Sequence, residues 1–459
     1  MATTLDLVVI AVYLVITLII GLIASKREHL EGYLINNRKT KLLLLTTSNI
    51  ATQIGAGAIV GVASAAYTTG ISYGIVNIIA ILLSFILFAY ISPRIKQFGD
   101  KHRAYTLGDF FEHRFGKASK YVFAVCYVFL AFLWAAVQFV AIAQLIKILT
   151  GINFEIAMLA AAFITILYTS LAGMISDLTT DFFQFWVMVL TFVILVPLAW
   201  GKAGGVAALT ALPASYFNPL SFGGIVFFVG GIFLSGIVIL PEVHFWQRIY
   251  SADSASTARK SFLWGLPSIL FVFAAILCGL LAVKLAPNVS PDTSLFTMMN
   301  SVLPSGLLGL GFAGIIAIVM SSIDSILLGG SSTILKDLYI PFFHPKRREH
   351  ELLNMARYIT AIFGIASALV AFYFQSIVNL TIFAAFTAGC FSFAILGGLF
   401  WKRTTAKACV ASMISSLIVL FISYQFLKEK TFVPVFLVAI IVLIVVSLFT
   451  KHSPSEHYI

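Results

Sequence analysis

Three acidic side chains lie within apolar stretches of this sequence, where a carboxylate is costly. They are Asp181 in LAGMISDLTTDFFQ, Asp324 in AIVMSSIDSILLGGSS, and Glu242, which follows Pro241. An ionised side chain at the centre of a membrane helix costs about 2.5–3.5 kcal/mol even on the lenient insertion scale, so each acid is expected to have a function. Asp177 is nearer the end of its helix and is expected to be solvated or to cap that end.

Serine hydroxyls accompany one of these acids. Ser321, Ser322 and Ser325 share a helical face with Asp324. Hydroxyl, carbonyl and carboxylate oxygens are the ligands that a hard alkali cation prefers, so this face is a candidate cation site. Serines that hydrogen-bond to neighbouring membrane helices are the structural alternative.

Two apolar stretches carry unusual numbers of helix-breaking residues. The first holds Gly55, Gly57 and Gly61, and the second holds paired glycines at 230–231 and then Pro241. In a transporter, two interrupted helices at corresponding places in two halves point to the binding site, because unwound backbone frees carbonyls and amides for ligands. Glycines that allow close helix packing are the alternative.

The composition predicts an all-α protein with many membrane spans. Of 459 residues, 60% are hydrophobic and 10% are charged, and the mean hydropathy is +1.03. A soluble domain would be about a quarter charged, and apolar runs of 18 or more residues are long enough to cross a bilayer as helices. We expect thirteen spans: 5–25, 42–69, 73–95, 119–147, 154–173, 175–200, 223–249, 261–284, 306–335, 353–374, 379–400, 406–427 and 432–450.

The basic residues predict an orientation for these spans. The net charge is +11, and 24 of the 29 Lys and Arg residues fall in segments on one side of the thirteen-span arrangement, against 5 on the other. Such asymmetry marks the cytoplasmic side, which places the N-terminus outside and the C-terminus inside a bacterial inner membrane. The basic loops therefore orient the protein and do not indicate nucleic-acid binding.

The chain divides into four predicted segments. Residues 1–40 hold the first span and a cytoplasmic loop, 41–200 hold spans 2–6, 201–403 hold spans 7–11, and 404–459 hold the last two spans and a short tail. Each middle segment begins with one of the interrupted spans, so we expect the two segments to be inverted repeats.

The sequence resembles the sodium/solute symporter family. The resemblance rests on Ala172–Gln184, which is close to the family pattern GGMxAVxWTDxxQ, and on IVMSSIDSILLGGSSTILKDLY at 318–339. Ala172 replaces the first glycine of the pattern, and Leu178 with Thr179 replaces the residues before Thr180. The resemblance covers nearly the whole chain and implies the five-plus-five inverted-repeat fold of LeuT-like transporters, with alternating access.

The family resemblance also implies Na⁺ sites. One sodium ion would bind to backbone carbonyls and serine hydroxyls contributed by Ala51, Ile54, Ile318, Ser321 and Ser322. A second sodium ion, bound by some relatives, would use Asp181 with Ser322 and Ser325, and Asp324 is a further candidate.

Several stretches, including ATQIGAGAIVGVASAAYTTG and FWQRIYSADSAS, look most like the high-affinity choline transporter branch. Choline recognition needs a cage of aromatic faces. Trp134 stands at one cage position, but Gln53 and Glu242 replace tryptophan at two others. These two residues suit an amino acid, an amine or a polyol. The predicted solute-binding residues are Gln53, Gly55, Gly57, Trp134, Gln138 and Glu242.

These candidates have structural alternatives too. Trp134 is also a plausible packing aromatic, and Glu242 could instead pair with His244 or Arg248 in its own helix.

The expected function is sodium-coupled uptake of a small polar organic solute. A proton-coupled symporter, with the proton carried by Asp324 or Glu242, is the nearest alternative. A sensor acting through a partner protein is another. An enzyme is not expected, because the sequence has no nucleophile and base pair, no HExxH motif and no Cys/His metal cluster.

Overall fold

A computed structural model describes residues 3–25, 29–171, 173–343, 348–373 and 376–451. Ala172, at the start of the family motif, lies outside these residues. The first half contains α1 Thr4–Ser25, α2 Leu30–Ile35, η1 Asn36–Arg38, α3 Leu42–Gln53, η2 Gly57–Gly61, α4 Val62–Thr69, α5 Ser72–His102, α6 Leu107–Phe115, α7 Lys117–Thr150, α8 Phe154–Leu171, α9 Met174–Ala203, α10 Val206–Thr210 and η3 Ala214–Phe217.

The second half is also helical. It contains α11 Gly224–Ser235, α12 Val243–Ser251, α13 Ala255–Gly265, η4 Leu266–Ser268, α14 Ile269–Leu285, η5 Pro291–Thr293, α15 Ser294–Val302, α16 Leu307–Thr333, η6 Ile334–Tyr339, α17 Ile340–Phe343, α18 Glu349–Tyr373, α19 Ile377–Phe400, α20 Ala406–Leu427, η7 Lys428–Lys430 and α21 Phe432–Phe449. The described residues form helices and no extended strand, as the composition predicts.

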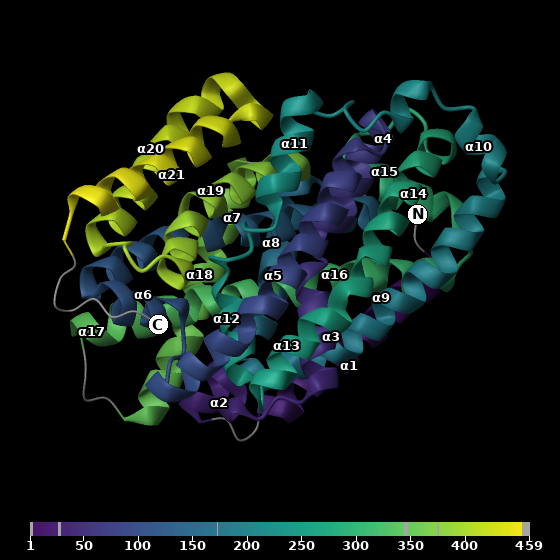
Figure 1. Ribbon diagram of the computed structural model, residues 1–459. Helices are drawn as coiled ribbons and strands as arrows, with labels where there is room; N and C mark the ends of the chain where they lie inside the picture. The colour runs from purple at the N-terminus through teal and green to yellow at the C-terminus, as the bar shows by residue number, and fades with distance from the viewer. Residues whose placement is uncertain (1–2, 26–28, 172, 344–347, 374–375, 452–459) are drawn as a thin grey trace.

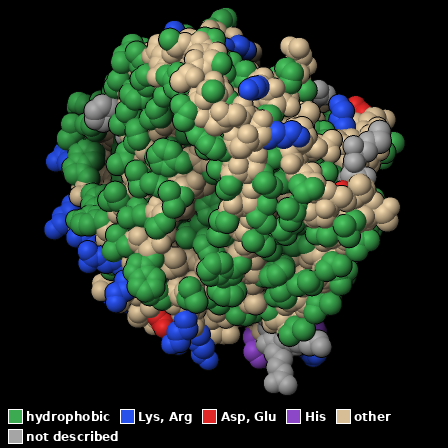
Figure 2. All heavy atoms as spheres, turned by 90° about the vertical axis from the view of Figure 1, so that its right-hand side faces the viewer, with side chains coloured by type: hydrophobic (Ala, Val, Ile, Leu, Met, Phe, Trp, Pro, Cys, Tyr) green, Lys and Arg blue, Asp and Glu red, His purple; other side chains and the backbone are tan. Residues whose placement is uncertain are grey.

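Ten helices of the described chain are long and apolar enough to span a membrane, or eleven if the bent pair of Leu42–Gln53 with Gly57–Thr69 is one span. The expected span 154–173 falls on α8, and the expected span 223–249 falls on the two short helices α11 and α12. The count of thirteen and the sidedness of the termini stay predictions. Hydrophobic side chains cover most of the face in Figure 2, and Lys and Arg lie mainly at its margins, as expected for a surface in lipid.

Both glycine-rich spans are interrupted, as predicted. The helix axis bends by 53° between α3 and the η2–α4 segment, and a non-helical stretch separates α11 from α12. In Figure 1, α4 and α11 lie toward the end of the bundle that carries α10, while α3 and α12 lie toward the end that carries α6. We call these the α10 end and the α6 end.

The long helix α16 is the centre of the bundle. From Leu307 to Phe343 it continues through η6 and α17, and 94% of its most apolar window is buried inside the protein. Around it pack α1, α3, α7, α9 and α18. Helix α16 therefore contacts protein on all sides, which lets it carry serines and an acid at membrane depth.

Most of the apolar face of the short helix α6 packs on protein. Thr106 and Asp109 make a reciprocal capping box at its start. Phe111 stacks on Phe123 of α7 with ring centroids 4.3 Å apart. Two connections between longer helices contain short helices, α10 with η3 in one and η5 with α15 in the other.

Close packing between the interrupted span and α14 gives a first prediction. A Cβ atom at Gly279 would lie 2.4 Å from the backbone oxygen of Ala63, which cannot move as a side chain would. We expect Gly279→Ala to destabilise the protein by about 1–3 kcal/mol through overpacking. The measurement is the apparent melting temperature in detergent, with Gly201→Ala as the matched control. A Cβ atom at Gly201 meets nothing within 4 Å. Equal melting temperatures for both variants would contradict the packing described here.

Candidate functional site

The end of α3 pairs with the middle of α16 through serine hydroxyls and backbone carbonyls. Ser321 Oγ donates to the Ala51 carbonyl at 2.9 Å and to the Ile318 carbonyl at 3.1 Å. Ser322 Oγ donates to the Thr52 carbonyl at 3.0 Å and to the Ile318 carbonyl at 3.2 Å. Five oxygen atoms therefore gather between two helices in a fully buried place.

The break after α3 frees one more carbonyl here. Ile54 has non-helical dihedral angles, φ −88° and ψ 67°. In a continuous helix the Ala58 N–H would donate to Ile54, but it donates instead to the Gly55 carbonyl at 3.1 Å. Hydroxyl and carbonyl oxygens are the donor set that a hard alkali cation prefers. We call the five predicted sodium ligands, Ala51, Ile54, Ile318, Ser321 and Ser322, the sodium junction.

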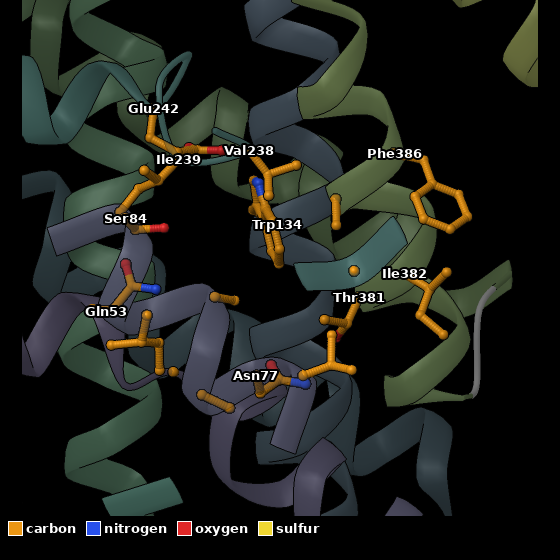
Figure 3. A pocket seen from close by; sticks show the side chains of 18 of the residues that line it. Gln53, Asn77, Ser84, Trp134, Val238, Ile239, Glu242, Thr381, Ile382 and Phe386 are labelled. Carbon is orange, nitrogen blue, oxygen red and sulfur yellow. The ribbon is translucent and has the colours of Figure 1, made fainter. Parts of the chain in front are cut away.

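A cavity of about 230 Å³ adjoins the sodium junction. All six residues predicted to bind the solute line it, namely Gln53, Gly55, Gly57, Trp134, Gln138 and Glu242. In Figure 3, Gln53, Ser84 and Glu242 lie on one side of the cavity, Thr381, Ile382 and Phe386 lie on the opposite side, and Trp134 stands between them. Polar groups therefore gather mainly on the side of Gln53, Ser84 and Glu242, where Ile239 also lies, and the opposite side is largely apolar apart from Thr381.

Two glycines let helices approach closely beside this cavity. A Cβ atom at Gly55 would lie 2.7 Å from Ser322 Oγ and 2.9 Å from Gln138 Nε2. A Cβ atom at Gly57 would lie 2.8 Å from Thr381 Oγ1. The Gln138 amide also holds the broken backbone directly, because its Oε1 accepts from the Ala56 N–H at 3.0 Å. Gly55 and Gly57 thus shape the site through their lack of a side chain.

Comparison with known proteins agrees with this geometry. Residues 33–416 match the sodium:solute symporter family. The chain belongs to this family. It is therefore a multi-pass membrane transporter, not an enzyme, and it couples the movement of a small organic solute to sodium. The family resemblance predicted from the sequence is confirmed at this level.

Individual relatives are more distant. The chain is similar to a protein named sodium/proline symporter from Staphylococcus aureus (strain JH9), with 28% identity over 97% of this chain and 92% of the relative. In fold it is similar to a Na⁺-coupled sialic acid symporter in a substrate-bound outward-open state, with a TM-score of 0.83, 18% identity and 99% of both chains covered. It is also similar to Mhp1, a nucleobase-cation-symport-1 family transporter, with a TM-score of 0.62, 13% identity and 92% and 96% covered. These structures are LeuT-fold transporters, which confirms the predicted fold class.

The residues suggested for a second sodium ion of the symporter do not all meet. Asp181 and Ser325 are both close to the guanidinium of Arg248, whose Nη2 lies 3.0 Å from Asp181 Oδ2 and 2.6 Å from Ser325 Oγ. Asp324 instead accepts a hydrogen bond from Thr169 of α8. The second sodium site stays a prediction.

One expectation about a charged residue is wrong. Asp177 is not solvated: only 2% of its surface is exposed, and its Oδ2 accepts from Arg248 Nη2 at 2.8 Å. Its partner Arg248 is completely buried as well. The two residues meet because α12 runs on from Glu242 to Ser251 and places Arg248 against the face of α9 that carries Asp177 and Asp181.

Other site residues were not found from the sequence. Asn77, Ser84 and Thr381 line the cavity, as do Phe432 and Phe436 of the last helix. Each is a single polar or aromatic residue in an apolar span, and such residues are common where helices pack. The sequence carries no signal that separates them from packing residues.

The sodium junction gives a second prediction. In Ser322→Ala the junction loses one oxygen ligand, a change of about 1–2 kcal/mol, so the sodium concentration that gives half-maximal thermal stabilisation should rise about tenfold. The control is Ser332→Ala on the same helix, whose buried hydroxyl has no hydrogen-bond partner. An unchanged sodium requirement in Ser322→Ala would remove this residue from the site.

Proposed function

We propose that the symporter takes up a small organic amine whose protonated nitrogen binds to Glu242. The observation that carries this proposal is the state of the Glu242 carboxylate. It is 4% exposed, it lines the cavity, and neither of its oxygens has a hydrogen-bond partner. A buried carboxylate without a partner is strongly unfavourable. A positive group on the solute would supply the missing partner.

The surroundings of Glu242 support a cationic solute. Nδ1 of His244 lies 3.7 Å from Glu242 Oε2, beyond hydrogen-bond distance. The Trp134 indole N–H approaches the carboxylate without a well-formed hydrogen bond. The cavity lining has no lysine or arginine among the described residues. The positive charge must therefore come with the solute, and the Trp134 ring adds a face for it.

The polar side of the cavity favours a primary or secondary amine. Glu242 and the amide oxygen of Gln53 accept hydrogen bonds, and an ammonium group with N–H bonds can satisfy both. A quaternary ammonium such as choline has no N–H to donate and needs aromatic faces instead. The choline-branch resemblance therefore does not extend to the chemistry of this cavity.

The other side of the cavity favours an apolar body. Ile382 and Phe386 of α19 face the polar side across the cavity, and Phe432 and Phe436 of α21 line it as well. Burial of apolar solute surface against these side chains would contribute about 25 cal/mol per Å². A polyol or sugar would leave its hydroxyl groups without partners on that side.

A zwitterionic amino acid is the second candidate, and one relative named sodium/proline symporter favours it. Its carboxylate would need a positive partner. Helix η2 begins at Gly57 beside the cavity, and the N-terminus of such a broken helix carries a partial positive charge that suits a carboxylate.

The proposed sodium ligands are the carbonyls of Ala51, Ile54 and Ile318 and the hydroxyls of Ser321 and Ser322. Sodium would draw the broken end of α3 against α16 and so stabilise the polar wall of the cavity. One sodium ion crossing 100 mV with a tenfold gradient supplies about 3.7 kcal/mol, enough for a few hundred-fold accumulation of a neutral solute. A monocationic solute adds about 2.3 kcal/mol through its own charge.

The proposed orientation places the α6 end in the cytoplasm of a bacterial inner membrane. At that end the ammonium of Lys120 lies 3.2 Å from Asp109, 2.8 Å from Glu112 and 3.2 Å from Asp337, which ties α6, α7 and η6 together. The cavity lining instead extends to the first turns of α5, α11 and α21, at the α10 end. This arrangement supports a conformation that is closed to the cytoplasm and faces outward.

A third prediction tests the role of Glu242. Glu242→Gln keeps the shape of the side chain and removes its charge, so we expect binding of phenethylamine and pyrrolidine to fall at least tenfold, by analogy with the loss of a buried charged partner. Binding is measured by thermal shift in saturating sodium chloride. The control is Glu155→Gln, at an exposed position near the start of α8.

Matched solutes distinguish the two candidates. Phenylalanine and proline carry the same bodies as phenethylamine and pyrrolidine with an added carboxylate, and choline tests the quaternary ammonium. Stabilisation by the amino acids alone would overturn the monocation proposal in favour of a zwitterion. In proteoliposomes, sodium and pH gradients imposed separately test the coupling: uptake driven by the pH gradient alone would favour the proton-coupled alternative. Binding without uptake under either gradient would favour a sensor.

A further inference from the structure

Arg248 lies at the crossing of four helices, completely buried. Its Nη2 atom is 2.7 Å from Thr52 Oγ1, 2.8 Å from Asp177 Oδ2, 3.0 Å from Asp181 Oδ2 and 2.6 Å from Ser325 Oγ. Its Nε donates to Ser48 Oγ at 2.9 Å. One side chain on α12 therefore holds α3, α9 and α16 together. We call these six residues the arginine cluster.

The arginine cluster is directly connected to the sodium junction. The Thr52 carbonyl accepts a hydrogen bond from Ser322 of the junction, while the Thr52 hydroxyl meets Arg248. On α16, Ser325 Oγ donates to the Ser321 carbonyl at 2.9 Å and lies against Arg248. Any change in the α3–α16 contact thus alters the positions of two of the oxygens around the guanidinium.

The arginine cluster is equally connected to the solute cavity. Helix α12 has only nine residues, from Val243 to Ser251, and Glu242 is its N-cap. Glu242 and His244 line the cavity, and Arg248 Nη1 donates to the His244 carbonyl at 3.4 Å. Glu242 and Arg248 are thus separated by less than two turns of one helix, which ties the position of one to that of the other.

We infer that Arg248 is the positioning residue that couples the sodium junction to the solute cavity. With sodium bound, α3 and α16 hold Thr52 and Ser325 at the distance that Arg248 requires, and α12 then places Glu242 in the cavity wall. Without sodium the two oxygens separate, and Arg248 stays with the aspartates of α9. Because such coupling is reciprocal, occupation of the cavity also strengthens sodium binding.

The chemistry of the cluster explains why arginine is needed. A guanidinium is planar and presents several N–H donors in a fixed geometry. Its hydrogen bonds therefore depend on the relative positions of its acceptors. A lysine ammonium keeps the charge that Asp177 and Asp181 require, but it is a point charge without that fork. Arg248→Lys therefore preserves charge and is expected to relax the geometric link.

The experiment uses sodium chloride alone as the ligand and a reporter cysteine, Val238→Cys, in the cavity wall just before Glu242. Its alkylation rate by a maleimide is measured with and without sodium, relative to the protein without the reporter. The four native cysteines are buried. We expect sodium to change this rate about fivefold or more, the lower range of allosteric coupling. In Arg248→Lys we expect a change below about twofold, while the sodium concentration for half-maximal thermal stabilisation shifts less than about threefold.

A second pair of variants guards against misfolding of Arg248→Lys. Thr52→Val removes the hydroxyl that meets Arg248 and keeps the carbonyl that accepts from Ser322 of the sodium junction. It should reduce the sodium-dependent rate change in the same way. The control is Thr47→Val on the same helix, whose hydroxyl donates only to carbonyls of its own helix, at Leu43 and Leu44.

The outcomes separate this inference from the sodium site on which it rests. If sodium does not stabilise the unmodified symporter, the proposed sodium junction fails. If sodium stabilises it but the reporter rate changes equally in Arg248→Lys, Thr52→Val and Thr47→Val, the coupling role of Arg248 is wrong. It is also wrong if Arg248→Lys and Thr52→Val lose sodium stabilisation itself, because the cluster would then only support the sodium site.

Discussion

A backbone carbonyl that leaves a helix inside a membrane must find another partner, and the contact between α3 and α16 satisfies this requirement. The carbonyls of Ala51 and Thr52 accept from the hydroxyls of Ser321 and Ser322. These are neutral hydrogen bonds, worth about 0.5–1.5 kcal/mol each, so a cation can replace them at little cost. The same oxygen atoms therefore satisfy the broken helix and are the ligand set that we propose for sodium.

Buried charges in this protein fall into two kinds according to their partners. Arg248 is fully occupied by Asp177, Asp181 and neighbouring hydroxyls, and Lys120 is held among three carboxylates at the α6 end. Glu242 differs, because its carboxylate faces a cavity and has no hydrogen-bond partner. Charges with partners hold helices together, whereas the position of Glu242 at the cavity supports its proposed role in binding the solute.

Short helical segments connect the cavity to the sodium junction and to Arg248. Helix α12 begins at the cavity and carries Arg248 less than two turns later, and the unwound end of α3 contributes both to the cavity and to the sodium junction. Gly55 allows this close arrangement, because a side chain there would meet Ser322 and Gln138. The proposed sodium and solute sites share these segments, so each can influence the other directly, without a long pathway.

The sequence by itself determined the helical membrane architecture, the two interrupted spans and the family, because long apolar runs, helix breakers and ordered motifs are local properties of the chain. The six residues that it indicated as solute ligands, from Gln53 to Glu242, line one cavity, and their role in binding stays a proposal. Only the tertiary structure decided which charges meet. Arg248 and Asp177 are 71 residues apart, and each alone is typical of a helix end near the cytoplasm. Their pairing depends on how α9 and α12 cross, and no spacing within either helix encodes that crossing.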